Sequence, residues 1–133
     1  MLRVFPLLIL ILAAYNAVVF FTKLTTESAV FAISLPSKDA LAVSLGGLLL
    51  ALGLLLLYVE IVKATRTSTV AVVDHVLSMA VFVVALLEFL LLKGFGTLTF
   101  FLITLMTFID VIAGFTVTIQ GARRDFGVDR AGY

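Results

Sequence analysis

Long apolar runs separated by short polar stretches dominate this chain. An α-helix needs about 20 mostly apolar residues to cross a bilayer. Four runs reach that length, over residues 4–23, 40–62, 70–92 and 97–120, and a short tail, 121–133, follows the last of them. The pattern predicts an all-α integral membrane protein whose four transmembrane helices form an up-down bundle within a single membrane domain.

The connections between the runs predict how the spans are joined. Residues 93–97 (KGFGT) form a short turn with two glycines, so the third and fourth spans are expected to be antiparallel neighbours. The first and second spans are separated by a longer stretch that is itself partly apolar. Within it, SAVFAISL (residues 28–35) is expected to lie flat at the membrane interface as a short helix.

The N-terminal run also has one feature of a secretory signal peptide, because Arg3 precedes an apolar stretch. The run continues past Tyr15 and Asn16, however, and LAAYNAV is a poor cleavage site. We therefore expect residues 4–23 to be retained as a span.

Lysine and arginine residues set the predicted orientation, because cytoplasmic loops carry an excess of them. Six lie at one end of the predicted bundle, namely Arg3, Lys63, Arg66, Arg123, Arg124 and Arg130. Three lie at the other end, namely Lys23, Lys38 and Lys93. We therefore expect both termini in the cytoplasm and the protein in the inner membrane of a bacterium.

Composition narrows the functional classes. Of the 133 residues, 63% are hydrophobic and 13% are charged, whereas roughly 25% of the residues in a soluble domain are charged. The chain has no cysteine and one histidine, which excludes thiolate chemistry and a multi-histidine metal cage within one chain. Its net charge of +1 indicates no nucleic-acid partner. We expect no metal, no cofactor and no catalytic residues, and predict that the protein is not an enzyme.

Small residues recur at helical spacing within the predicted spans. Between helices in lipid, such residues permit close approach. Gly46 and Gly53 lie seven residues apart on one stripe of the second span, Ala85 lies on a stripe of the third, and Gly114 lies on a stripe of the fourth. We expect these four residues to be helix-packing positions.

Four carboxylates lie in or at the spans, on the same stripes as the small residues: Glu60, Asp74, Glu88 and Asp110. A charge at the centre of a bilayer costs about 2.5–3.5 kcal/mol on insertion scales. The carboxylates are therefore expected to face protein and not lipid. Glu60 is close to Lys63 in the sequence and is expected to pair with it or to reach toward the interface.

Asp110 is the deepest of these carboxylates, roughly 15 Å from the cytoplasmic end of its predicted span. Asn16 on the first span has a similar predicted depth and leans toward Asp110, and Thr107 lies one turn back. We predict an intramembrane polar cluster of Asp110, Asn16 and Thr107, in which an uncharged Asp110 binds Asn16. His75 differs in depth by roughly 7.5 Å and is not expected to contact Asp110.

Two functions fit these features. Packing stripes and short loops favour a small non-catalytic membrane protein, either an accessory or structural subunit of a complex or a self-associating oligomer. Its partners would be the lipid bilayer and its own copies or other membrane subunits. The alternative is a small oligomeric proton- or cation-coupled transporter or channel, with Asp74, Glu88 and Asp110 as an ion path. The spans lack the interruptions and proline kinks common at substrate sites, so the first function is preferred.

Overall fold

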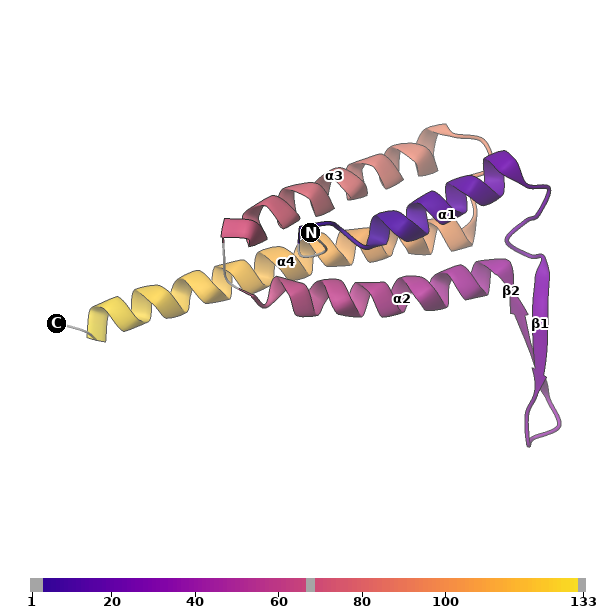
Figure 1. The fold of residues 1–133 in the computed structure, drawn as a ribbon, viewed down its shortest axis with the longest axis horizontal. Helices are drawn as coiled ribbons and strands as arrows, with labels where there is room; N and C mark the ends of the chain where they lie inside the picture. The colour runs from indigo at the N-terminus through magenta and orange to yellow at the C-terminus, as the bar shows by residue number, and fades with distance from the viewer. Residues whose placement is uncertain (1–3, 67–68, 132–133) are drawn as a thin grey trace.

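The computed structural model describes residues 4–66 and 69–131. In this part of the chain there are four helices and one two-stranded sheet, in the order α1 (Leu8–Phe21), β1 (Ala29–Ser34), β2 (Ala40–Ser44), α2 (Leu45–Ala64), α3 (Thr69–Leu91) and α4 (Leu98–Ala131). The helices lie side by side as a bundle (Figure 1). The start of α1 and the connection from α2 to α3 lie at one end, here termed the terminal end. The strands and the turn from α3 to α4 lie at the other, the hairpin end.

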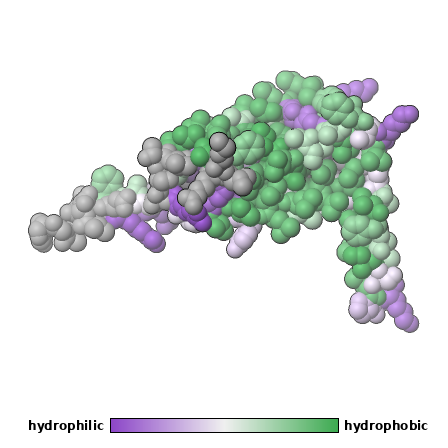
Figure 2. Space-filling view, viewed as in Figure 1, coloured by the Kyte–Doolittle hydropathy of each residue, from purple (hydrophilic) through white to green (hydrophobic). Residues whose placement is uncertain are grey.

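Three of the helices, α2, α3 and α4, are long and apolar enough to cross a membrane. At a rise of 1.5 Å per residue, the 20 residues of α2 measure about 30 Å, which is the thickness of the hydrocarbon core. Helix α1 is apolar but shorter, with 14 residues. The face of the bundle seen in Figure 2 is largely hydrophobic. The predictions of an integral membrane protein and of a helix bundle are confirmed.

The third span and the turn after it agree with the prediction. Helix α3 covers Thr69–Leu91, where residues 70–92 were expected, and α4 returns antiparallel beside it (Figure 1). Gly94 in the connecting turn has φ +92°. This backbone conformation is open to glycine but strained for most other residues, so Gly94 allows the chain to reverse within a few residues.

The segment between α1 and α2 differs from the prediction. Residues 28–35 were expected to form an interfacial helix, but β1 occupies this stretch and pairs antiparallel with β2. The expectation of an all-α protein is therefore wrong here, and α2 begins at Leu45, five residues later than the predicted span. Ser44 ends β2 and caps α2, since its Oγ accepts a hydrogen bond from the N–H of Gly47 at 3.1 Å.

The last helix extends beyond the predicted span. Residues 121–133 were expected to form a separate tail, but α4 continues without interruption to Ala131. Residues 132–133 lie outside the described part of the chain. The predicted fourth span, residues 97–120, is therefore the first two thirds of one 34-residue helix.

Aromatic side chains form the core at the hairpin end. Tyr15 of α1, Phe95 of the α3–α4 turn and Phe100 of α4 are all fully buried. Their ring centroids lie 4.6 to 5.3 Å apart, within the usual range for aromatic pairs. These contacts hold α1 against the start of α4.

Candidate functional site

Five polar side chains from three helices meet toward the terminal end of the bundle. They are Glu60 and Lys63 of α2, Asp74 and Ser78 of α3, and Asp110 of α4, here termed the Lys63 cluster. The four members other than Lys63 are each 6% exposed or less. Glu60 and Lys63 are three residues apart and Asp74 and Ser78 four apart, so each pair lies on one helix face. Helical periodicity thus turns all of these groups into the bundle.

The Lys63 ammonium group is the centre of the cluster. Its Nζ lies 3.2 and 3.1 Å from the two carboxylate oxygens of Glu60 and 3.5 Å from Oδ1 of Asp74. It also donates to the backbone carbonyl of Phe5 at 2.8 Å. The expected pairing of Glu60 with Lys63 is confirmed. Lys63 joins α2, α3 and the N-terminal segment through one charged group.

The N-terminal segment is fastened to the cluster at two points. Beside the Phe5 carbonyl, which accepts from Lys63, the backbone N–H of Leu7 donates to Glu60. The N–H groups at the start of a helix have no acceptor within the helix. Glu60 supplies one to Leu7, the residue before α1. The cluster therefore fixes where α1 enters the bundle.

Asp110 brings α4 into the same cluster. It lies beside the Ser78 side chain of α3 and close to the charged groups of Lys63, Asp74 and Glu60. The Glu60 and Asp74 carboxylates pair with the Lys63 ammonium group, and the Asp110 carboxyl group lies near them. With all three ionised the cluster would carry a net charge of −2, which is costly inside a membrane. A proton taken up by one of these carboxyl groups would reduce this cost.

The predicted partner of Asp110 is not the one that the structure shows. Asn16 donates instead to the backbone carbonyl of Leu12 at 2.9 Å and to Oε2 of Glu88 at 3.1 Å. Asn16 lies five residues before the end of α1, whereas Asp110 lies twelve residues after the start of α4. Counted from the shared hairpin end, their levels differ by about 10 Å. The prediction that Asp110 binds Asn16 is therefore wrong.

Thr107, the third member of the predicted cluster, is buried and bonds within its own helix. Its hydroxyl donates to the backbone carbonyl of Thr104 at 2.6 Å. Buried threonines commonly satisfy their hydroxyl in this way. Thr107 thus has its hydrogen bond without Asp110, and the expected three-residue cluster is replaced by the Lys63 cluster.

The candidate ion-path carboxylates lie in two separate places. Asp74 and Asp110 belong to the Lys63 cluster, whereas Glu88 lies near the hairpin end and is bound to Asn16. Asp74 and Glu88 are fourteen residues apart on α3, which is about 21 Å along the helix. The buried residues between them on this helix include the apolar Val81 and Ala85. Glu88 is therefore remote from the other two carboxylates.

Two of the predicted packing glycines lie where helices or loops approach closely. A Cβ on Gly46 would be 2.6 Å from Oγ1 of Thr99 and 3.0 Å from the backbone oxygen of Thr26. A Cβ on Gly53 would be 2.9 Å from the sulfur of Met106. The missing side chains allow α2 to lie against α4 and the loop before β1.

The other two predicted packing positions are also enclosed, Gly114 by α3 and Ala85 by the hydrophobic core. A Cβ on Gly114 would come within 2.5 Å of the His75 ring, which crosses α4 at this point. His75 Nε2 is 2.7 Å from Oγ1 of Thr118, so it bonds to a residue other than Asp110, as expected. Ala85 is completely buried.

Sequence reasoning missed two features of the polar interior. Lys63 was treated as an end-of-span residue, and its spacing to Glu60 was the available signal for a deeper role. Tyr15 was not singled out, because one tyrosine in an apolar run carries little signal. In the structure its hydroxyl donates to the backbone carbonyl of Gly94 at 3.0 Å and lies 2.7 Å from Oγ1 of Thr97. Tyr15 thus fastens α1 to the α3–α4 turn.

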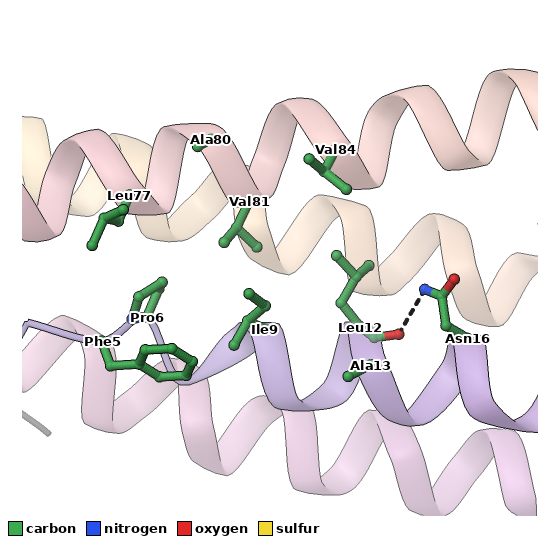
Figure 3. A pocket seen from close by; sticks show the side chains of 10 residues that line it. All are labelled: Phe5, Pro6, Ile9, Leu12, Ala13, Asn16, Leu77, Ala80, Val81 and Val84. Carbon is green, nitrogen blue, oxygen red and sulfur yellow. Dashed lines mark hydrogen bonds between the residues drawn. The ribbon is translucent and has the colours of Figure 1, made fainter.

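A groove of about 360 Å³ opens between α1 and α3 (Figure 3). Its lining consists of Phe5, Pro6, Ile9, Leu12, Ala13, Asn16, Leu77, Ala80, Val81 and Val84. The lining is almost wholly apolar, and the Asn16 amide is bonded to the Leu12 carbonyl of its own helix (Figure 3). The volume falls within the range of ordinary ligand pockets. The groove is suited to bind lipid acyl chains or the apolar side chains of another protein.

Comparisons with known proteins give no match: no family model, curated protein or solved structure is similar to the chain. In the part of the chain that the structure describes, no group of three or more histidine or acidic side chains is placed to hold a metal ion.

Proposed function

We propose that the protein is a small, non-catalytic accessory or structural subunit that associates with another membrane protein through the groove between α1 and α3. One observation carries the proposal. The groove is apolar and open at the side of the bundle. The charged side chains of Glu60, Lys63 and Asp74 do not line the groove but pair with one another in the interior of the bundle. These charged groups therefore contact other parts of the same chain, and the surface available to a partner is apolar.

Helix packing in lipid supports this use of the groove. Association between membrane helices depends on close contact, because lipid tails are as apolar as the side chains they would replace. The groove carries the small residues Ala13 on α1 and Ala80 on α3, which would let another helix approach closely. Helix α1 packs chiefly against α2 and only lightly against α3. A partner helix would complete the packing between α1 and α3.

The proposal includes four spans in a bacterial inner membrane, with both termini in the cytoplasm. The basic residues support this orientation. Lys63, Arg66, Arg123 and Arg124 belong to segments at the terminal end, and fewer basic residues, Lys23, Lys38 and Lys93, belong to the hairpin end. Helix α1 measures about 21 Å, so it would need local thinning of the bilayer or its flanking residues to complete a span.

Site-specific crosslinking in native membranes tests the proposal. The chain has no cysteine, so Ala80→Cys introduces a unique thiol in the groove that can carry a photoreactive maleimide. The matched control is Leu55→Cys on the lipid-facing side of α2, where Leu55 is well exposed. We expect a protein adduct from position 80 and lipid adducts from position 55. Only lipid adducts from both positions would contradict the subunit role, and an adduct with a second copy would indicate self-association.

A second function, a proton- or cation-coupled transporter or channel, is favoured by one specific observation. Two carboxylates, Glu60 and Asp74, pair with the Lys63 ammonium group in the interior of the bundle, and the buried Asp110 carboxyl group lies near them. Groups of this kind in membrane helices often belong to ion or proton paths. Four short spans enclose little space, so transport would require an oligomer.

Flux in liposomes tests this second function. A transporter that uses the Lys63 cluster would lose proton or cation flux in Asp110→Asn. Glu88→Gln is the matched control, because Glu88 lies outside the cluster and its replacement can still accept a hydrogen bond from Asn16. The absence of flux with the unaltered protein, or equal flux in both variants, would rule against transport through the cluster.

A further inference from the structure

The β1–β2 hairpin has two unlike faces. Side chains alternate between the faces of a sheet, and residues directly opposite each other on paired strands share a face. The register therefore gives one face, here termed the large face, with the cross-strand pairs Phe31–Val43 and Ile33–Leu41. The other, here termed the small face, has the pairs Ala32–Ala42 and Ser34–Ala40.

Three of the four side chains on the large face are exposed, and Val43, nearest to α2, is half-buried. Phe31, Ile33 and Leu41 are 47%, 49% and 51% exposed. A two-stranded hairpin is marginally stable by itself in water and needs something to pack against. Three exposed large apolar side chains on one face of a projecting hairpin therefore indicate contact with an apolar medium or partner.

The direction of the hairpin indicates that an apolar medium, the lipid, covers the large face. Its strands run roughly at right angles to the helices and project beyond the side of the bundle (Figure 1). Ser44 passes directly into α2 at Leu45, so the hairpin lies at the level where α2 begins. With α2 crossing the bilayer, the hairpin lies parallel to the membrane plane, at the boundary between hydrocarbon and headgroups.

The backbone and the tip of the hairpin fit this depth. Each strand has one edge without a partner strand within the hairpin. In hydrocarbon every unpaired N–H or C=O group costs several kcal/mol, but headgroups and water can satisfy them at the interface. The tip is hydrophilic (Figure 2), and it holds Lys38, whose ammonium group suits lipid phosphates, next to Asp39.

We propose that the β1–β2 hairpin lies on the bilayer surface at the hairpin end, with its large face against lipid acyl chains just below the headgroups. The occupant of this face is lipid of that leaflet. The small face is turned to water. The proposal depends on α2 crossing the membrane, and it is independent of whether the groove between α1 and α3 binds a partner.

Tryptophan fluorescence tests the proposal, because the chain has no tryptophan of its own. Phe31→Trp places the probe on the large face, and Ala32→Trp, the next residue, places it on the small face. Leu41→Trp repeats the large-face measurement from β2. Each full-length variant is placed in phosphatidylcholine nanodiscs whose acyl chains carry bromine close to the carbonyl, and iodide is added as the aqueous quencher.

We expect both large-face variants to emit at shorter wavelength, to lose most of their fluorescence to brominated lipid, and to resist iodide. Ala32→Trp should show the reverse pattern. Equal quenching of all three variants by iodide would overturn the proposal, since the hairpin would then stand in water. Large-face tryptophans that resist both quenchers would also overturn it, because protein and not lipid would then cover this face.

Discussion

The two ends of the bundle are held together by different chemistry. At the terminal end, the ammonium group of Lys63 bonds to Glu60, Asp74 and the Phe5 carbonyl. At the hairpin end, α1 is fastened by the neutral hydroxyl of Tyr15 and by aromatic packing. One end thus relies on a shared charge and the other on hydrogen bonds and shape.

This difference has an energetic consequence. A buried ion pair contributes little net stability, but the loss of one partner is strongly destabilising, because the other charge remains without compensation. A neutral hydrogen bond contributes about 1 kcal/mol to the free energy of unfolding. The cost of a packing defect depends on how far the neighbouring side chains can move. The terminal end should therefore be the more sensitive to single substitutions.

The replacement of Lys63 by methionine should have the largest effect. It leaves the paired carboxylates of Glu60 and Asp74 without their cation and releases the Phe5 carbonyl. We expect a loss of about 3–5 kcal/mol in the free energy of unfolding, measured by titration with sodium dodecyl sulfate in mixed micelles. Lys93→Met, at the exposed hairpin end, should change stability by less than about 0.5 kcal/mol. Equal stability of the two variants would remove the proposed distinction between the ends.

At the hairpin end, Gly46→Ala should have the next largest effect. The added Cβ meets Oγ1 of Thr99 and the backbone of Thr26, and backbone moves less readily than a side chain. We expect a destabilisation of about 1–3 kcal/mol in the same titration. Gly47→Ala is the matched control, because its Cβ has ordinary contact at 3.4 Å with Ser44. Equal losses in the two alanine variants would show that close approach at Gly46 is not the cause.

The hydroxyl of Tyr15 should contribute less. Tyr15→Phe keeps the aromatic packing but removes the hydrogen bonds to the Gly94 carbonyl and to Thr97. We expect a loss of about 1 kcal/mol, measured by thermal unfolding followed by circular dichroism. Tyr58→Phe is the control, since Tyr58 is mostly exposed. A larger loss in Tyr58→Phe would contradict the role given to the Tyr15 hydroxyl.

The smallest effect is expected from Glu88→Gln. The replacement retains an oxygen that accepts from Asn16 and removes one charge. The change in stability should be about 0.5 kcal/mol or less. The same substitution at Glu60 disrupts the pair with Lys63 and should cost several times more. If the two glutamine variants lose equal stability, charge is not what distinguishes the ends.

The sequence predicted the apolar spans better than the chain between them. The third span was correct within one residue at each end, because a long apolar run followed by KGFGT leaves few alternatives. Residues 28–35 were assigned to a helix, since a short apolar run does not by itself distinguish helix from strand. Val30, Phe31 and Ile33 favour a strand, and Pro36 and Ser37, residue types common in turns, separate this run from the next apolar run. Together these signals indicated a hairpin.

The site was partly predictable. Helical periodicity correctly predicted that Asp74 and Asp110 face protein. They share a stripe with small residues that pack against other helices, and exposure of a carboxylate to lipid would be costly. To predict the partner of Asp110, the depth of each polar residue in the membrane had to be known. That depth was counted from the assumed ends of the spans. Helix α1 starts at Leu8 and α4 continues to Ala131, so counting from residues 4 and 120 made Asn16 and Asp110 appear level. Relative levels of helices depend on turns and packing, which a single sequence does not specify.

The length of α4 has a consequence for whatever lies beyond the membrane. Its 34 residues measure about 51 Å, which exceeds the hydrocarbon thickness by about 20 Å. An uninterrupted helix fixes both the distance of its far end from the membrane and the rotational orientation of that end about the helix axis. One residue inserted after Arg124 would lengthen the helix by only about 1.5 Å but rotate everything after it by about 100°. A protein bound or fused at this end would therefore respond to the phase of the insertion more than to its length.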